Sequence, residues 1–348
     1  MDFKKCICLL LIITGSLNLV AQENKTQKIG LCLSGGGAKG LAHIGLLKQI
    51  DSLGIKIDYI TGTSMGSVVG GLYAAGYTGY QIDSIAHTID WDLLLNQYVP
   101  MNDIYIDEKD EYGRYLGEIP IKKGKLVVTG FIEGQELLNT LMRLTKHVNQ
   151  INDFNELPIP FKCMAVDIVN VTPVVMDHGS LAIAMRSSMS IPTVFKPVKV
   201  DGRLLVDGGV MVNFPVKQLK EMGADIIIGS YTGGRLMTEN EMNTFNKLLV
   251  QSSSFYGINK SKDEILLCDV FSNLTDSMKQ FSAGDFKKSL RIIEAGDVLS
   301  HNALPQLIKL ANKQKSNGII YEKKKLIQPS DFFKVEYCYC ARMRLKNE

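Results

Sequence analysis

The sequence predicts an α/β fold, in which buried strands alternate with helices in one large domain. Two segments carry this pattern. In residues 28–53 and again in residues 59–76, a short apolar run meets a glycine-containing turn and then a helix-forming stretch. Such alternation is typical of an α/β sheet. The 348 residues, 45% hydrophobic and 22% charged, suffice for one such domain with an appendage.

Residues 1–21 are predicted to be a secretory signal peptide. Lys4 and Lys5 precede an apolar run that ends at Val20, and the small Ala21 is followed by polar residues. A retained membrane anchor is the alternative, although a run of about 15 residues is short for a membrane span. We therefore expect a chain exported across the inner membrane, to the periplasm, the outer membrane or the outside of the cell.

A glycine-rich loop follows the first strand, which is expected from Lys28 to Ser34. The helix after the loop should run to about Leu53, because Gly54 ends its apolar pattern. The loop residues are Gly35, Gly36, Gly37, Ala38, Lys39 and Gly40. N–H groups at the start of a helix have no intrahelical partner, so this loop is a candidate anion site.

Two interpretations of this loop compete. The spacing of Gly35, Gly37 and Gly40 also fits a dinucleotide-binding fingerprint, which requires an acidic residue at the end of the second strand. Asp58 is the available acid, but it precedes that strand instead of following it. The sequence therefore favours an oxyanion hole over a dinucleotide site.

The second strand, Tyr59 to Thr61, runs into a Gly-x-Ser-x-Gly turn and a helix that Gly76 ends. Ser64 stands at the tip of the turn between Gly62 and Gly66. A serine in this position needs a strained backbone, and glycines leave the room for it. The following helix would point its positive N-terminal end at the serine oxygen. Ser64 is thus a candidate nucleophile.

Asp207 ends a third candidate strand, Leu204 to Val206, and Gly208 and Gly209 follow it. An aspartate at the tip of a buried strand is placed like an active-site group, although Asp-Gly also occurs in ordinary turns. The remaining elements are expected as helices at 79–96, 135–146, 182–188, 237–249 and 286–310, and as strands at 161–168, 171–176, 195–200, 224–229 and 265–271.

Two other segments have less certain roles. Residues 103–130 are rich in tyrosine and charge and are expected to form hairpins or a mobile flap. Trp91 and the run Leu93 to Leu95 would form a membrane-facing edge or part of the core, since tryptophan favours the head-group region of a bilayer.

The glycine loop, Gly-x-Ser-x-Gly and Asp-Gly-Gly occur in this order, and together they resemble the patatin-like phospholipase family. Other stretches are similar to that family too: Gly40 to Gly45, Phe131 to Gln135, Arg186 to Pro192, and Leu205 to Gly209 with Asn213 and Pro215. The resemblance covers residues 28–230 and implies a three-layer αβα fold with a central, mostly parallel sheet. Residues 231–315 would extend the same domain, and residues 316–348 would form a tail.

The resemblance implies a serine hydrolase of phospholipid or lysophospholipid esters that works with a Ser–Asp dyad. Ser64 would be the nucleophile and Asp207 its general base, with backbone N–H groups from Gly35 to Ala38 as the oxyanion hole. A membrane surface is the expected partner, and neither a cofactor nor a metal is implied. Lys39 stands where the family often has arginine, which argues against a bidentate anion contact and for a solvated lysine.

Composition excludes several other classes. A net charge of +3 is too small to indicate a nucleic-acid partner. Cys32, Cys163 and Cys268 lie in apolar runs and should be buried, while Cys338 and Cys340 lie near the end, and this spacing indicates neither a disulfide framework nor a metal site.

None of the five histidines follows a strand end as Asp207 does, so we expect histidine to be dispensable. The rival functions are a nucleotide-binding protein and a catalytically silent lipid-binding or scaffold protein of the same fold.

Overall fold

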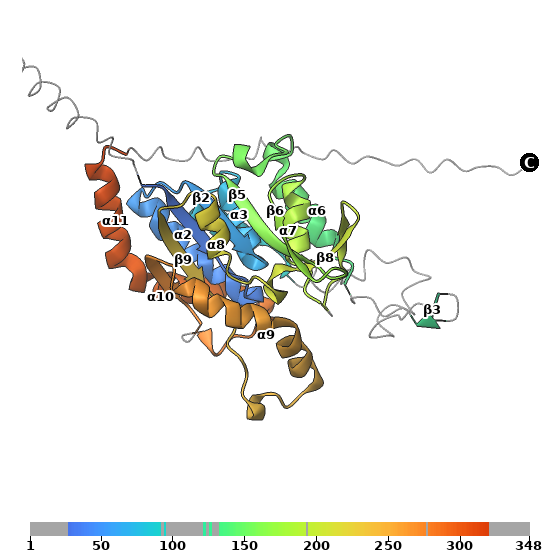
Figure 1. Ribbon diagram of the computed structural model, residues 1–348. Helices are drawn as coiled ribbons and strands as arrows, with labels where there is room; N and C mark the ends of the chain where they lie inside the picture. Colours follow the sequence, from blue (N-terminus) through green and yellow to red (C-terminus); the bar gives the residue numbers. More distant parts are fainter. Residues whose placement is uncertain are drawn as a thin grey trace, which may run out of the picture.

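The computed structural model describes residues 27–91, 94, 121–122, 125–126, 132–192, 194–275 and 278–319. Its main sheet has the strand order β10-β9-β1-β2-β5-β8-β7, with β6 paired to β5 (Figure 1). The strands of this sheet are β1 (Ile29–Leu33), β2 (Tyr59–Thr63), β5 (Phe161–Asp167), β6 (Thr172–Met176), β7 (Val198–Val200), β8 (Arg203–Asp207), β9 (Ile226–Tyr231) and β10 (Val270–Asn273). From β10 to β5 the neighbours are parallel, whereas β6, β7 and β8 pair antiparallel. The predicted α/β class with a mostly parallel sheet is confirmed.

Helices cover both faces of this sheet. They are α2 (His43–Leu53), α3 (Met65–Ala74), α4 (Gly79–Thr88), α6 (Gln135–Leu144), α7 (Leu181–Ser188), α8 (Val216–Glu221), α9 (Phe245–Ile265), α10 (Ser289–Ser300) and α11 (Leu304–Ser316). Side chains of a strand alternate between its two faces. Leu31 of β1 accordingly packs in the core with α2 and α3, while Cys32 packs with Phe214 and Leu219 on the side of α8. The result is three layers, αβα.

The segment after β9 belongs to the same packing. β10 extends the main sheet, and Ile292 of α10 and Leu307 of α11 join the core cluster that contains β1 and α2. Helix α10 crosses α2 closely, because Gly45 and Gly296 remove side chains at the contact. Within the described residues, we find no helix with the length and apolarity that a membrane crossing requires.

Several expected helices differ from the observed ones. The helix predicted at 79–96 ends at Thr88, because Ile89 takes an extended conformation with ψ of 126°. Leu93 and Leu95 lie outside the described residues. The helix predicted at 286–310 is two helices, α10 and α11, joined by a short 3₁₀ turn at His301–Ala303. Pro305 in the first turn of α11 explains the break, since its ring cannot continue a preceding helix.

The region after β9 was also predicted with the wrong boundaries. The helix expected at 237–249 starts only at Phe245, where Thr244 caps it, and continues to Ile265. Residues Glu239–Glu241 form a separate 3₁₀ turn. The strand expected at 265–271 is observed as β10, four residues that begin at Val270. The apolar periodicity of this long helix is weak, so the sequence pattern did not predict where the helix begins and ends.

The remaining expectations are tested only in part. Of the hairpins expected at 103–130, two short antiparallel strands are described, β3 (Ile121–Lys122) and β4 (Lys125–Leu126), and the rest lies outside the described residues. The signal peptide at 1–21, most of the tail, Cys338 and Cys340 also lie outside them. Cys32 and Cys163 are buried as expected, while Cys268 is only partly buried.

Candidate active site

Ser64 occupies a strained turn between β2 and α3. Its φ of 52° and ψ of −127° lie outside the regions that side-chain-bearing residues usually adopt. A Cβ atom at Gly62 would collide with the carbonyl of Gly66, and one at Gly66 would collide with the carbonyl of Leu33. The two glycines are therefore required by contact, and the serine is 4% exposed at the carboxyl edge of the sheet.

The backbone of Ser64 is held by Ser188, a residue to which the sequence analysis gave no role. The Ser64 N–H donates to Ser188 Oγ over 2.9 Å, and Ser188 Oγ donates to the carbonyl of Met164 over 2.6 Å. Ser188 ends α7, inside the Arg186–Pro192 stretch that carried part of the family resemblance. That resemblance was the available signal, but no local pattern could pair residues 124 positions apart.

Asp207 reaches the same edge from β8. It lies opposite Ala165 of β5, and its N–H donates to the carbonyl of Ser190 over 2.9 Å. Its Oδ1 accepts from the N–H of Gly209 over 2.7 Å, and the carboxylate also hydrogen-bonds the side chain of Ser64. The structure thus brings the two residues into direct contact.

Burial gives Asp207 an unusual acidity. The side chain is buried, and the resulting desolvation raises its pKa from 3.8 to about 6. The hydrogen bonds from Ser64 and Gly209 act in the opposite direction but are weaker. The carboxylate is therefore ionised at neutral pH and is a stronger base than an ordinary aspartate.

The glycine loop lies against the serine, since a Cβ at Gly35 would be 3.0 Å from the Cβ of Ser64. Two of the amides predicted for the oxyanion hole already have acceptors. Gly35 N–H donates to the carbonyl of Asn213 over 3.2 Å, and Ala38 N–H donates to the carbonyl of Ala283 over 2.8 Å. Among the described residues, no acceptor is bound by the amides of Gly36 and Gly37, which precede the hydrogen bonds of the 3₁₀ helix η1 (Gly37–Ala42).

The rest of the loop is fixed by its neighbours. Gly37 has a φ of 57°, and a side chain there would run into Ala283. Lys39 and Gly40 lie within η1 rather than in an open loop. Lys39 is half-buried instead of solvated, and this burial lowers the pKa of its ammonium group.

The structure also bears on the dinucleotide interpretation. Asp58 lies at the amino end of β2, where its carboxylate accepts from the N–H of Ile29 over 2.9 Å. It is therefore at the opposite end of the sheet from the glycine loop. The carbonyl of Ala283 occupies the amide of Ala38 at the helix start, where a pyrophosphate would have to bind.

His43 is fully buried behind the loop and bonded on both ring nitrogens. Nε2 lies 2.9 Å from the carbonyl of Ser34 and 3.3 Å from Thr232 Oγ1, and Nδ1 lies 2.8 Å from Ser230 Oγ. Because a carbonyl oxygen can only accept, Nε2 carries the proton and Nδ1 accepts from Ser230. Desolvation lowers the pKa of His43 to about 4, so the ring is neutral. It holds the residue that precedes the glycine loop.

The other histidines are engaged elsewhere. His147 contacts the carbonyl of Ala75, His87 the carbonyl of Asp83, and His301 the carbonyl of Asp297. His178 is exposed beside Asp177. Within the described residues, no cluster of three or more His, Cys, Asp and Glu side chains is arranged to hold a metal ion.

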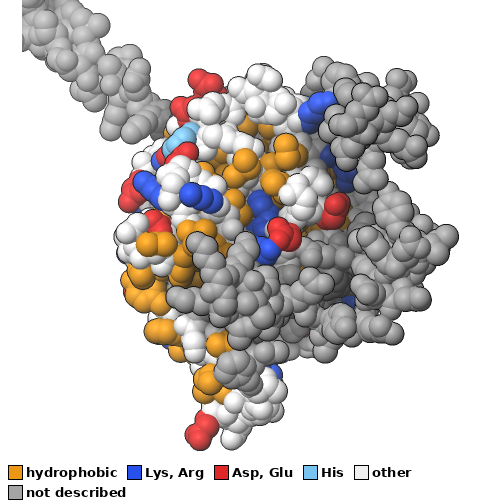
Figure 2. All heavy atoms as spheres, turned by 90° about the vertical axis from the view of Figure 1, so that its right-hand side faces the viewer, with side chains coloured by type: hydrophobic (Ala, Val, Ile, Leu, Met, Phe, Trp, Pro, Cys, Tyr) orange, Lys and Arg blue, Asp and Glu red, His pale blue; other side chains and the backbone are white. Residues whose placement is uncertain are grey.

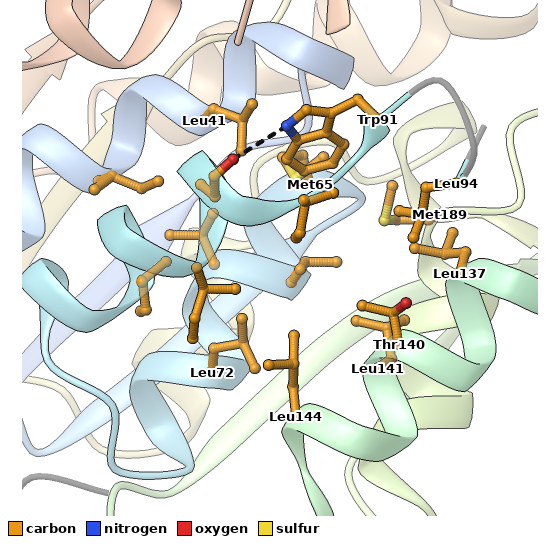
Figure 3. A pocket seen from close by; sticks show the side chains of 17 residues that line it. Leu41, Met65, Leu72, Trp91, Leu94, Leu137, Thr140, Leu141, Leu144 and Met189 are labelled. Atoms are coloured by element: carbon orange, nitrogen blue, oxygen red, sulfur yellow. Dashed lines mark hydrogen bonds between the residues drawn. The ribbon is translucent and has the colours of Figure 1, made fainter. Parts of the chain in front are cut away.

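A small apolar pocket lies beside this edge (Figure 3). Met65, Met189 and Leu41 line it, and they directly follow Ser64, Ser188 and Gly40 in the chain. Side chains of α3 and α6 face one another across it, and Thr140 is its one polar lining residue in the described part of the chain. The cavity therefore offers an apolar ligand a place next to Ser64.

Trp91 lines this cavity as well. Its Nε1–H donates to the carbonyl of Ala86 over 3.2 Å, and its ring packs on Phe286 with 5.3 Å between the ring centroids. The ring is partly buried and packs against the core cluster. Leu94 lines the cavity too.

Comparison with known proteins finds a family whose sequence model matches this chain. A model of the family described as "Patatin-like phospholipase" matches residues 31–220. An uncharacterised NTE family protein of Mycobacterium tuberculosis is 30% identical over 216 residues, which cover 62% of this chain and 52% of the relative. A lysophospholipase NTE1 of Candida albicans is 30% identical over 220 residues, covering 62% of this chain and 14% of the relative. The chain thus spans about half the length of the mycobacterial relative.

Solved structures show a distant likeness. VipD from Legionella pneumophila has a TM-score of 0.39 and 14% identity, and the match covers 82% of this chain and 67% of that one. The type III effector protein ExoU has a TM-score of 0.37 and 12% identity, and the match covers 81% of this chain and 53% of that one.

The raised pKa of Asp207 predicts a pH-dependent cost in stability. The folded state holds this proton more tightly than the unfolded chain, so the stability that the carboxyl contributes is present below pH 3.8 and is lost as the pH rises through about 6. Asp207→Asn cannot ionise. It should therefore gain about 2 kcal/mol over the parent in free energy of unfolding between pH 4 and pH 8. Urea unfolding at both pH values measures this gain, and a gain no larger than that of the exposed control Asp201→Asn would contradict it.

The position of His43 predicts a structural effect on activity. His43→Ala removes the donor that holds Ser34, so the loop should lose its alignment and kcat for a soluble ester should fall by about 10- to 100-fold. Labelling of Ser64 by a fluorophosphonate should persist, because His43 does not touch that serine. His147→Ala, which loses a similar bond far from the loop, is the control. A folded His43→Ala protein that cannot be labelled would instead indicate a catalytic histidine.

Proposed function

The chain belongs to the patatin-like phospholipase family, and from this premise we propose that it hydrolyses acyl esters of phospholipids or lysophospholipids, with Ser64 as nucleophile and Asp207 as base. One observation carries the proposal. A serine on a strained turn is hydrogen-bonded to a buried aspartate whose pKa is raised to about 6. A nucleophile within reach of a base, at the edge of an apolar cavity, is the arrangement that acyl transfer requires.

In the first half of the reaction, Ser64 Oγ attacks the ester carbonyl while Asp207 accepts the hydroxyl proton. The negative charge that develops on the carbonyl oxygen is stabilised by the amides of Gly36 and Gly37, the loop donors without a bound acceptor in the described part of the chain. The positive end of α3 adds to this field. Asp207 then returns its proton to the leaving alcohol, and an acyl-enzyme remains.

In the second half, Asp207 accepts a proton from water, and the resulting nucleophile attacks the acyl-enzyme. The same two amides stabilise the second tetrahedral intermediate. When it collapses, the proton returns to Ser64 Oγ, the fatty acid leaves and the resting pair is restored. The chain's own residues supply every group that these steps use, so the proposal includes neither a metal nor another cofactor.

The apolar cavity supports a lipid as the substrate. Its lining begins with Met65, directly after the proposed nucleophile, and continues along α3, α4 and α6. An acyl chain held there would place its ester bond at the carboxyl edge of the sheet, and each buried CH₂ group would contribute about 0.8 kcal/mol to binding. The relatives named lysophospholipase agree with this substrate class.

The alternative is a catalytically silent lipid-binding or scaffold protein of the same fold. Such a protein would use the cavity but would not need an activated serine. A parent protein that binds lipid but hydrolyses no ester would therefore be the silent protein, whereas one that does both would be the hydrolase.

Substitution of the proposed pair tests the function. Ser64→Ala should keep the fold and lower kcat for a short-chain soluble ester by a factor on the order of 10⁶, and Asp207→Asn should cost nearly as much, because nucleophile and base act as a unit. Fluorophosphonate labelling should occur in the parent and fail in Ser64→Ala. Ser252→Ala, which changes an exposed serine of α9, is the control. A parent protein that binds lipid but neither reacts with the probe nor hydrolyses any ester would support the silent alternative.

The pH dependence of kcat/KM tests the identity of the base. Asp207 must be ionised to accept the proton, so activity should rise with pH through an inflection near 6 and then level off. A histidine would titrate near the same pH, since its ordinary pKa is about 6.5. Temperature separates them, because ionisation of a carboxylic acid has little enthalpy and that of an imidazole has much. An inflection that moves strongly to lower pH on warming would contradict Asp207 as the base.

A further inference from the structure

The turn between β5 and β6 presents apolar side chains to solvent. Val169 is 70% exposed and Val171 64%, and Ile168 beside them is exposed as well. Leu204 of β8 joins them, because Ile168 N–H donates to the Leu204 carbonyl over 3.0 Å. These four side chains form one patch, which we call the hairpin patch. Turns at the surface usually carry Gly, Asn, Asp, Ser or Pro, so three β-branched residues around Asn170 need an explanation.

This turn is held rigidly. The buried carboxylate of Asp167 accepts from Val169 N–H over 3.0 Å, from Asn170 N–H over 3.3 Å and from Asn170 Nδ2 over 2.8 Å. Val171 takes a φ of 53°, which is rare for a β-branched residue. The chain therefore fixes its exposed valines in place instead of letting them fold back onto the sheet.

The hairpin patch lies on the same edge of the sheet as the proposed active site. Thr63 pairs with Met164, and Asp207 pairs with Ala165, so Ser64 lies near the level of Ala165 along β5. Strand β5 continues past this level to Asp167 before the turn begins. At about 3.3 Å per residue, the patch extends about 10 Å beyond the nucleophile.

Basic side chains border the patch. Lys199 of β7 lies opposite Leu204 in the antiparallel pair, and Arg203 precedes Leu204. Both side chains are exposed, and Asp201 is the exposed acidic residue between them in the chain. Figure 2 looks at the right-hand side of Figure 1 and shows hydrophobic side chains with lysine, arginine and acidic side chains among them. Apolar residues bordered by cations fit a surface of anionic lipid.

We propose that the hairpin patch, with Lys199 and Arg203, is the surface through which this protein contacts an anionic lipid bilayer. This inference rests on the proposed function, because a lipid hydrolase must take its substrate from such a surface. Ser64 is almost fully buried, so an ester has to leave the bilayer to reach it. A contact about 10 Å beyond the nucleophile keeps that path within the length of one leaflet's acyl chains, about 15 Å.

Partition of the purified protein onto vesicles tests this surface. The vesicles contain phosphatidylcholine alone or phosphatidylcholine with phosphatidylglycerol. Val169→Ser and Val171→Ser should each lower the partition coefficient by about tenfold, since each removes about two CH₂ groups from the contact. Lys199→Gln and Arg203→Gln should each lower it about fivefold on anionic vesicles, with little effect on zwitterionic ones. The matched control is Val298→Ser on α10, where the valine is also 70% exposed.

Other measurements keep this test separate from that of the proposed function. The hairpin variants should hydrolyse a soluble short-chain ester at the parent rate, and their reaction with a fluorophosphonate should be unchanged. If the parent protein hydrolyses no ester, the proposed function is wrong. The vesicle partition experiment would still test whether the hairpin patch contacts lipid. Equal partition of the parent and the valine variants would overturn the surface and leave the function intact.

Two further outcomes would show that the lipid contact lies elsewhere or that the hairpin patch has another role. Val250→Ser tests the exposed apolar residues of α9, which are Leu248, Val250, Phe255 and Tyr256. A larger loss of partition in this variant than in the hairpin variants would place the lipid contact on α9 and overturn the inference. A change of oligomeric state in size-exclusion chromatography, with unchanged partition, would make the patch an interface between copies of the chain and overturn it as well.

Discussion

The backbone of Ser64 is the constraint on which the rest of the site depends. A residue with a φ of 52° and a ψ of −127° persists only where its surroundings leave it no alternative. Gly62 allows β2 to approach α3, Gly66 allows α3 to approach the end of β1, and Gly71 allows α7 to pack against α3 near Met185. This packing brings Ser188, at the end of α7, to the amide of Ser64. The orientation of Ser64 is thus fixed by contacts between elements more than 100 residues apart.

Burial of Asp207 opposes the stability of this arrangement and also makes the carboxylate useful. An exposed carboxylate is a weak base for a serine hydroxyl, whereas desolvation raises the pKa of Asp207 to about 6 and so strengthens its attraction for the proton. The pairing of β8 with β5 and the hydrogen bond to Ser190 hold its backbone in place. Gly209 offers the carboxylate an N–H donor.

The sequence predicted what is encoded within a few neighbouring residues. Strand, turn and helix around Ser64 are local, and so is the strand end at Asp207, so the patterns predicted the fold class and the two side chains that the structure brings together. The hydrogen bonds of the loop amides are not local. The carbonyls of Asn213 and Ala283, in distant parts of the chain, accept from the N–H groups of Gly35 and Ala38. The C-terminal end of α4 was missed because the apolar periodicity of the sequence continues beyond the residue where the backbone turns. The ends of α9 were missed because the apolar periodicity of that helix is weak.

The energetics of the site argue against a protein that only binds lipid. Such a protein needs the apolar cavity, and burial of Met65, Leu72 and their neighbours lowers the free energy of the fold. It gains nothing from a serine in an unfavourable backbone conformation or from a buried ionised aspartate, since each raises the free energy of the folded state. The two features lie on interacting residues, next to Met65 of the pocket lining and near two amides with no bound acceptor in the described chain. Ester hydrolysis uses each of these features at once, because the attacking oxygen, the proton acceptor and the oxyanion donors must meet at a single carbonyl.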